Sequence, residues 1–162
     1  MRSAAYWIEK LQLATHIEGG AFREVYRSSM TVVPDGFPGE RNYATSIYFL
    51  LQQHQFSAFH RIKSDETWHF YYGDALIVYE IDRSGQLIEH HLGNEPDKGQ
   101  QFQCAIAAGN WFAARVAEGG AYTLCGCTVS PGFDFADFEL ARQHELLTQY
   151  PQHASLIKAL TI

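Results

Sequence analysis

The residues of this chain whose types suit chemistry are concentrated between positions 57 and 73. Within this stretch a histidine, His60, and a carboxylate, Glu66, lie on either side of a short polar turn. Because side chains alternate between the two faces of a strand, His60 faces the same way as Ile62. Glu66 shares its face of the next strand with three aromatic residues, Trp68, Phe70 and Tyr72. A histidine and a carboxylate on one wall can bind a metal ion, transfer a proton or hold a polar ligand.

Polar groups from other strands could join this site. Arg23 and Arg27 share one face of a predicted strand, and a planar guanidinium group suits a phosphate or a carboxylate. An exposed strand face or an ion pair at a subunit contact is the alternative for each arginine. Ser46 supplies a hydroxyl group, and Trp111 supplies a large aromatic ring on another predicted strand. We therefore add Arg23, Ser46 and Trp111 to the candidate ligand-binding residues.

Most of the chain consists of short strand-like segments separated by turn residues. Strands are predicted over residues 21–27, 43–51, 57–62, 66–72, 76–81, 86–91, 102–107, 111–116 and 122–129. Apolar residues at helical spacing predict a short helix within residues 4–14 and a helical tail after residue 138. Helices and strands do not alternate, which argues against a parallel α/β sheet. The pattern predicts an all-β sandwich or barrel with helical ends.

Length and composition predict one domain over residues 1–162, large enough to bury a core. A formal net charge of −6 argues against nucleic-acid binding, which normally requires a basic surface. No apolar run is long enough to span a bilayer, and the first residues lack the pattern of a signal peptide. Three cysteines do not make a disulfide framework. We therefore expect a cytoplasmic protein with free thiols and without a nucleic-acid or membrane partner.

The stretch around His60 resembles the first motif of the cupin superfamily, which carries two histidines, a glutamate and a closing glycine. His60 occupies the first histidine position, Ile62 the second, Glu66 the glutamate position and Gly73 the glycine position. The likeness is closer still to the branch known as DUF985 or cupin-5, and it extends over nearly the whole chain. It is carried by Glu18-Gly19-Gly20, Tyr26-Arg27-Ser28, Thr45 to Leu51, Ser64-Asp65-Glu66, Trp68-His69-Phe70, Ala108 to Ala113 and Val129 to Phe135.

This resemblance implies an RmlC-like jelly roll, also called a double-stranded β-helix, with a ligand cavity at one end of the barrel. Metal-binding cupins use three histidines and a glutamate, but Ile62 and Phe112 stand at two of those positions here. His69 is a poor replacement, because simple alternation turns it to the face opposite Glu66 unless a bulge near Asp65 shifts the phase. We therefore expect no metal ion and no cofactor.

Three functions are compatible with these residues. The leading hypothesis is a metal-independent epimerase or isomerase acting on a sugar, a sugar nucleotide or a nucleobase-like ligand. In it His60 is the general base, Glu66 is its partner, and Trp68, Phe70 and Tyr72 form an aromatic wall. The alternatives are a noncatalytic small-molecule binding module and a metal-dependent cupin enzyme. We also expect a homodimer, because the predicted strand over residues 43–51 offers a second apolar face.

Overall fold

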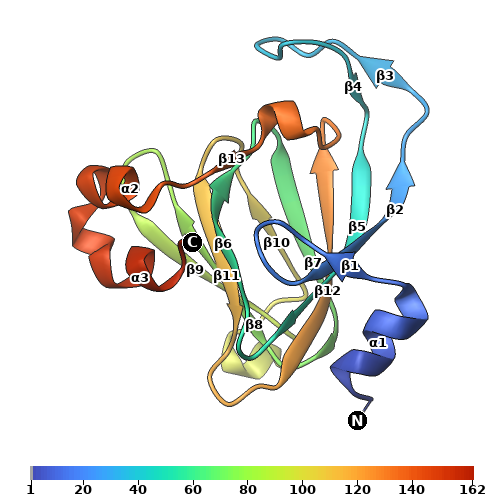
Figure 1. Cartoon of the computed structure of the whole chain (residues 1–162), viewed down its shortest axis with the longest axis vertical. Helices are drawn as coiled ribbons and strands as arrows, with labels where there is room; N and C mark the ends of the chain where they lie inside the picture. The colour runs from blue at the N-terminus through green and yellow to red at the C-terminus, as the bar shows by residue number, and fades with distance from the viewer. Residues whose placement is uncertain (1) are drawn as a thin grey trace.

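The computed structural model describes residues 2–162, and two antiparallel β-sheets form its body (Figure 1). The six-stranded sheet has the order β1 (Ala14–Thr15), β2 (Ala21–Arg27), β5 (Thr45–Gln52), β12 (Tyr122–Ser130), β7 (Asp65–Gly73) and β10 (Gln103–Ile106). The five-stranded sheet has the order β13 (Glu139–Leu140), β6 (Phe56–Arg61), β11 (Trp111–Val116), β8 (Leu76–Ile81) and β9 (Leu87–Leu92). Strands far apart in the sequence are neighbours in both sheets. The predicted all-β jelly roll, a double-stranded β-helix, is confirmed.

The main core lies between the two sheets. Phe49 and Trp68 of one sheet meet Phe112 of the other, and the rings of Phe49 and Trp68 are 5.7 Å apart in an edge-to-face arrangement. These three side chains are at most 1% exposed. Burying such large apolar surfaces is the main force that holds the two sheets together.

Short helices cover the outer faces of the sheets. Helix α1 (Ala4–Leu11) packs Trp7 and Ile8 against Leu50 and Leu124 on the six-stranded sheet. Helices α2 (Gln143–Gln149) and α3 (Ala154–Ala159) pack against the outer face of the five-stranded sheet (Figure 1). The predicted helical ends are thus present, and none of the helices within residues 2–162 is long and apolar enough to cross a membrane.

A hairpin and three 3₁₀ turns complete the chain. Strands β3 (Thr31–Val32) and β4 (Arg41–Asn42) pair within an arm that extends beyond the barrel between β2 and β5 (Figure 1). The 3₁₀ turns are η1 (Pro96–Lys98), η2 (Phe135–Asp137) and η3 (Pro151–His153). Turn η2 follows β12, the strand that lies between β5 and β7.

Two irregularities change the side-chain alternation expected from the sequence. In β2 the pairing with β5 skips Val25, so Arg27 pairs with Thr45 and its side chain lies on the inward face of the sheet. Simple alternation would have placed it on the outer face with Arg23. In β7 the pairing with β12 skips Tyr71, so Tyr72 leaves the face that Glu66 occupies. Each bulge inserts one residue, which is enough to reverse the direction of the side chains that follow.

Candidate functional site

A cavity of about 390 Å³ opens between the two sheets, beneath the loop that follows β12. Its buried end carries two histidines and two glutamates, namely His16, Glu18, His60 and Glu66. Its rim carries the exposed residues Glu24, Arg27, Asp134 and Phe135. The wall between them is largely apolar and includes Phe22, Ile47, Ile62, Val129 and Phe133. Polar groups are therefore concentrated at the two ends of an apolar channel.

His60 and Glu18 form a buried pair. The Nε2 atom of His60 lies 3.1 Å from a carboxyl oxygen of Glu18, and its Nδ1 atom lies 2.7 Å from the carbonyl oxygen of Ala58. A carbonyl oxygen only accepts hydrogen bonds, so a neutral His60 ring carries its proton on Nδ1 and leaves Nε2 as an acceptor. Burial lowers the pKa of His60 to about 4, which keeps the ring neutral near pH 7. Glu18 must then donate the proton that lies between the two side chains.

Glu18 is a buried cavity residue that the sequence analysis did not include in the candidate site. It lies in the turn between β1 and β2, where its backbone carbonyl accepts a hydrogen bond from Ala58 at 2.8 Å. Its side chain accepts a hydrogen bond from Ser57 at 2.8 Å. Burial raises the pKa of Glu18, while His16 and Ser57 lower it. The sequence did mark this turn, since Glu18-Gly19-Gly20 is part of the cupin-5 likeness, but nothing in the pattern placed it against His60.

Gly19 allows this close approach of the turn to the neighbouring strand. Its φ is +113°, and a Cβ atom at this position would lie 2.0 Å from the carbonyl oxygen of Phe56 in β6. Only glycine fits where the backbone both adopts a positive φ and touches another strand. The turn therefore fixes the distance between Glu18 and His60.

Glu66 is a carboxyl group that stays protonated at neutral pH. Burial, and the nearby carboxyl group of Glu18, raise its pKa to about 8, whereas a hydrogen bond with the thiol of Cys127 lowers it. Two carboxyl groups facing the same apolar space cannot both ionise without a large desolvation cost. Glu66 therefore offers the cavity a proton, as expected of a general acid or a hydrogen-bond donor.

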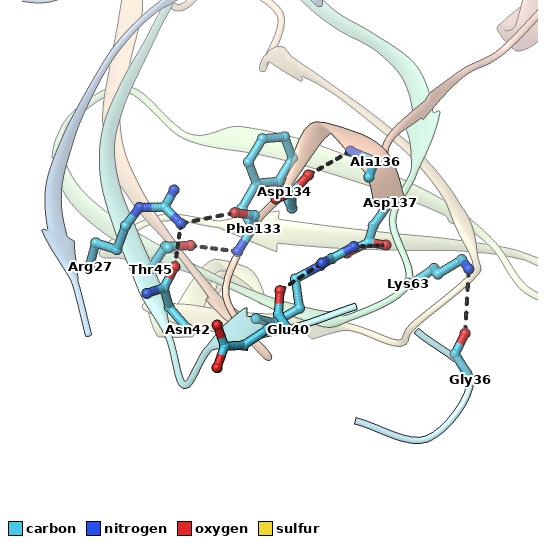
Figure 2. A network of polar contacts seen from close by, with 11 residues as sticks. Arg27, Gly36, Glu40, Asn42, Thr45, Lys63, Phe133, Asp134, Ala136 and Asp137 are labelled. Carbon is cyan, nitrogen blue, oxygen red and sulfur yellow. Dashed lines mark hydrogen bonds and ion pairs between the residues drawn. The ribbon is translucent and has the colours of Figure 1, made fainter. Parts of the chain in front are cut away.

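An ion pair between Arg27 and Glu24, with additional hydrogen bonds from Arg27, fixes the rim of the cavity. Figure 2 shows the contacts of Arg27 with Asn42 and Phe133. Arg27 donates to both carboxylate oxygens of Glu24, at 2.9 and 2.7 Å. It also donates to the side chain of Asn42 at 2.7 Å and to the carbonyl oxygen of Phe133 at 3.3 Å. These contacts connect β2, the arm and the loop after β12, so Arg27 holds three segments in one position.

The loop after β12 is anchored at two more points. The backbone N–H of Phe133 donates to the hydroxyl of Thr45 at 2.9 Å. Arg41 donates twice to Asp137, at 2.6 and 3.0 Å, and both side chains are at most 7% exposed (Figure 2). Breaking a buried ion pair leaves an uncompensated charge, so the pair holds η2 against the arm. Phe133 and Phe135 are thereby kept over the cavity.

The aromatic wall predicted from β7 lies elsewhere. Trp68 is 1% exposed and belongs to the core between the sheets, where Phe70 packs beside it. Tyr72 packs against Trp7 of α1 on the outer face, because of the bulge at Tyr71. None of the predicted three lines the cavity, whose aromatic side chains come instead from Phe22, Phe133 and Phe135. Alternation within one strand could not identify a wall built from two other segments.

The other predicted ligand-binding residues lie outside the cavity as well. Arg23 donates to Gln12 at 3.3 Å and lies near the ring of Tyr48 on the outer face of the six-stranded sheet. Ser46 bonds with Thr128, which in turn bonds with His69 on that same face, opposite the core side chain of Trp68. Trp111 packs among the C-terminal helices, beneath the guanidinium of Arg61 at 4.4 Å. His60, Glu66 and Arg27 are the sequence candidates that the cavity brings together.

The residues of the cavity do not fit the metal site that the cupin fold implies. Ile62 and Phe112 hold two of the four ligand positions, and neither side chain has a donor atom. The ring of Phe112 lies 4.1 Å from the ring of His60, and both ring nitrogens of His60 already have partners. Among residues 2–162 no group of three or more His, Cys, Asp or Glu side chains could hold a metal ion. A transition metal requires three or four donor atoms that converge on one point, and the two histidines and two glutamates of this cavity do not form such a group.

Comparisons with known proteins agree with this architecture. Residues 5–141 match the family described as Cupin superfamily (DUF985). A hypothetical protein from Leishmania major is 35% identical with a TM-score of 0.93, over 99% of both chains. A protein from Shewanella oneidensis is 39% identical with a TM-score of 0.91, over 100% of this chain and 99% of that one.

More distant comparisons define the fold alone. Oxalate decarboxylase from Bacillus subtilis has a TM-score of 0.56 at 16% identity, and the match covers 90% of this chain and 36% of that one. No protein of curated function matches the sequence. The family match and the two full-length similarities show that the chain belongs to the cupin superfamily, in the family described as DUF985.

Proposed function

We propose that the cavity binds a small polar ligand and, without a metal ion, transfers a proton next to a carbonyl group of that ligand, as an epimerase or isomerase does. The observation that supports the proposal is the set of Glu18, His60 and Glu66 at the buried end of an apolar cavity. An acid and a base whose surroundings shift their pKa values apart, in a space shielded from water, are what such a reaction requires.

The proposed base is the pair of Glu18 and His60 rather than His60 alone. Both ring nitrogens of His60 are engaged, so the ligand meets the carboxyl group of Glu18. When the shared proton moves to Nε2 of His60, the freed carboxylate of Glu18 can accept a proton from a carbon atom of the ligand. Glu66 gives its own proton to the carbonyl oxygen, which yields a neutral enol. Glu18 then gives its proton to the neighbouring carbon while Glu66 takes a proton back from the enol, which gives the isomer. If the enol turns over in the cavity, Glu18 gives its proton to the other face of the same carbon instead, which gives the epimer. In both cases the proton on Nε2 of His60 returns to Glu18.

Noncatalytic ligand binding is the second candidate. The engagement of both His60 nitrogens is also what a structural brace would show, with Glu18 joining the β1–β2 turn to β6. In that case the cavity would hold a ligand through Glu66 and its apolar wall and would leave every carbon–hydrogen bond of the ligand intact.

Deuterium uptake separates the two candidates. We would select ligands from free sugars, sugar nucleotides and nucleobases by their stabilisation of the protein, then follow each bound ligand in D₂O by proton NMR. We expect exchange at one carbon position, reduced about 10²-fold or more in Glu18→Gln and Glu66→Gln with binding retained. Glu89→Gln, an exposed glutamate on β9, is the control and should exchange normally. If the ligands bind but take up no deuterium, the proposed proton transfer is wrong and noncatalytic ligand binding is the remaining candidate.

A further inference from the structure

We propose that the cavity selects uncharged ligands over phosphorylated and other anionic ones, and that Glu24 sets this selectivity by occupying Arg27. The inference names the ligand class of the site, and so it rests on the proposed binding of a small polar ligand. It narrows the candidates from sugar nucleotides and sugar phosphates to free sugars and neutral heterocycles.

The charges along the cavity support this selectivity. Four carboxyl groups line it, from Glu18, Glu24, Glu66 and Asp134. Among the lining residues that the structure describes, Arg27 alone carries a guanidinium or ammonium group. A phosphate group binds where cationic donors outnumber acceptors, as in arginine clusters or lysine sites. This lining has the opposite balance.

Each of the three guanidinium nitrogens of Arg27 already donates a hydrogen bond. Glu24 takes its Nε and one terminal nitrogen, while Asn42 and the Phe133 carbonyl share the other terminal nitrogen. An anion entering from solvent would have to displace the bidentate carboxylate of Glu24 and would then lie beside it. Because like charges in a partly enclosed site repel, Glu24 both blocks the guanidinium and disfavours its replacement.

The interior offers an anion no compensation. Glu66 and Glu18 present carboxyl oxygens at the buried end, and Phe22, Ile47 and Phe133 line the way to it. A carbonyl or hydroxyl group can accept the proton that Glu66 holds and bury its carbon skeleton against these apolar side chains. A phosphate would lose its water shell without finding cationic partners, which disfavours its entry.

The test removes the negative charge of Glu24 and keeps its shape. We expect Glu24→Gln to bind inorganic phosphate at least about fivefold more tightly than the natural protein, as measured by calorimetry and by phosphorus NMR. The control is Glu139→Gln, because the Arg61–Glu139 pair has the same 2.7 Å contact and similar exposure but lies outside the cavity. The double variant Glu24→Gln/Arg27→Gln should lose the gain in phosphate affinity, since the guanidinium group that would bind phosphate is then absent.

Each other outcome overturns the inference. If the natural protein binds phosphate with an affinity within twofold of that of the Glu24→Gln variant, the Arg27–Glu24 pair does not exclude anions. If Glu24→Gln gains no more phosphate affinity than Glu139→Gln, other residues set the selectivity. The same conclusion follows if the double variant without Arg27 keeps the gain in affinity. Phosphate binding is measured without turnover, so absent deuterium exchange would contradict the proposed reaction and leave this result standing.

Discussion

Glu66 retains its proton near pH 7 because burial and the neighbouring Glu18 raise its pKa to about 8 from an ordinary value of 4.5. A carboxyl group in this condition donates a hydrogen bond instead of only accepting them. The same residue in a solvent-exposed strand would be an ordinary negative charge. In the cavity, burial thus turns a glutamate that would otherwise be ionised into a hydrogen-bond donor.

The raised pKa predicts how stability depends on pH. Between pH 4.5 and about 8 the unfolded chain has lost the proton of Glu66, while the folded protein keeps it. The free energy of unfolding should therefore fall as pH rises through this window, by on the order of 1 kcal/mol per pH unit from this one group. Glu66→Gln, which cannot ionise, should flatten that dependence when urea unfolding is measured at pH 5.5, 6.5 and 7.5. If the pH dependence of the unfolding free energy is unchanged in Glu66→Gln, Glu66 is already ionised at neutral pH. If the exposed Glu89→Gln flattens that dependence equally, the effect does not come from the buried position of Glu66.

At the residue scale the sequence identified only part of the site. His60 and Glu66 could be predicted because one short hairpin carries both and alternation determines their faces. Glu18 could not, because a turn from a distant part of the chain brings it to His60. Arg27 was predicted to share the face of Arg23, but a bulge at Val25 turns it to the opposite face, and the order of side chains does not reveal such a bulge.

At the scale of elements, the turn between β1 and β2 positions Glu18 against His60. Two similar pentads make this testable, since Glu18-Gly19-Gly20-Ala21-Phe22 resembles Glu118-Gly119-Gly120-Ala121-Tyr122. Gly19 and Gly119 both have positive φ, at +113° and +81°. A Cβ at Gly19 would clash with β6, whereas a Cβ at Gly119 would meet no atom within 4 Å.

Gly19→Ala should therefore cost much more stability than Gly119→Ala. We expect about 1 kcal/mol for Gly119→Ala, from backbone strain alone, and about 3 kcal/mol or more for Gly19→Ala. Gly19→Ala should also displace Glu18 from His60 and reduce any deuterium exchange. Urea unfolding of the two variants gives the comparison, and equal costs would mean that the turn does not depend on the close approach to β6.

At the scale of the whole molecule, the arrangement of strands was the easiest feature to predict. Short alternating segments with turn residues between them are compatible with few folds, and the cupin-5 motifs selected one of these. The helical ends followed from apolar spacing. What lines the cavity was harder, because its wall combines β2, β5, β12 and the loop after β12, and alternation says nothing about how segments distant in sequence meet.

The outer face of the six-stranded sheet supports the expected homodimer. Beyond the part that α1 covers, Tyr48, His69 and Tyr71 form a line of rings, with Tyr71 47% exposed. We propose that a second copy covers this face, as an aromatic surface of this kind favours association. Light scattering should give twice the chain mass for the natural protein and the single-chain mass for Tyr71→Arg. Tyr43→Arg, an exposed tyrosine on the arm, should remain dimeric. A monomeric natural protein would contradict the proposal.

The buried end of the cavity also changes the charge of the molecule as a whole. The formal net charge of −6 counts every carboxyl group as ionised, including Glu18 and Glu66. Near pH 7 the folded chain keeps the proton of Glu66, which the unfolded chain releases, and burial shifts the pKa of Glu18 in the same direction. Folding therefore takes up protons from the solution, and the native molecule is less acidic than its amino-acid composition indicates.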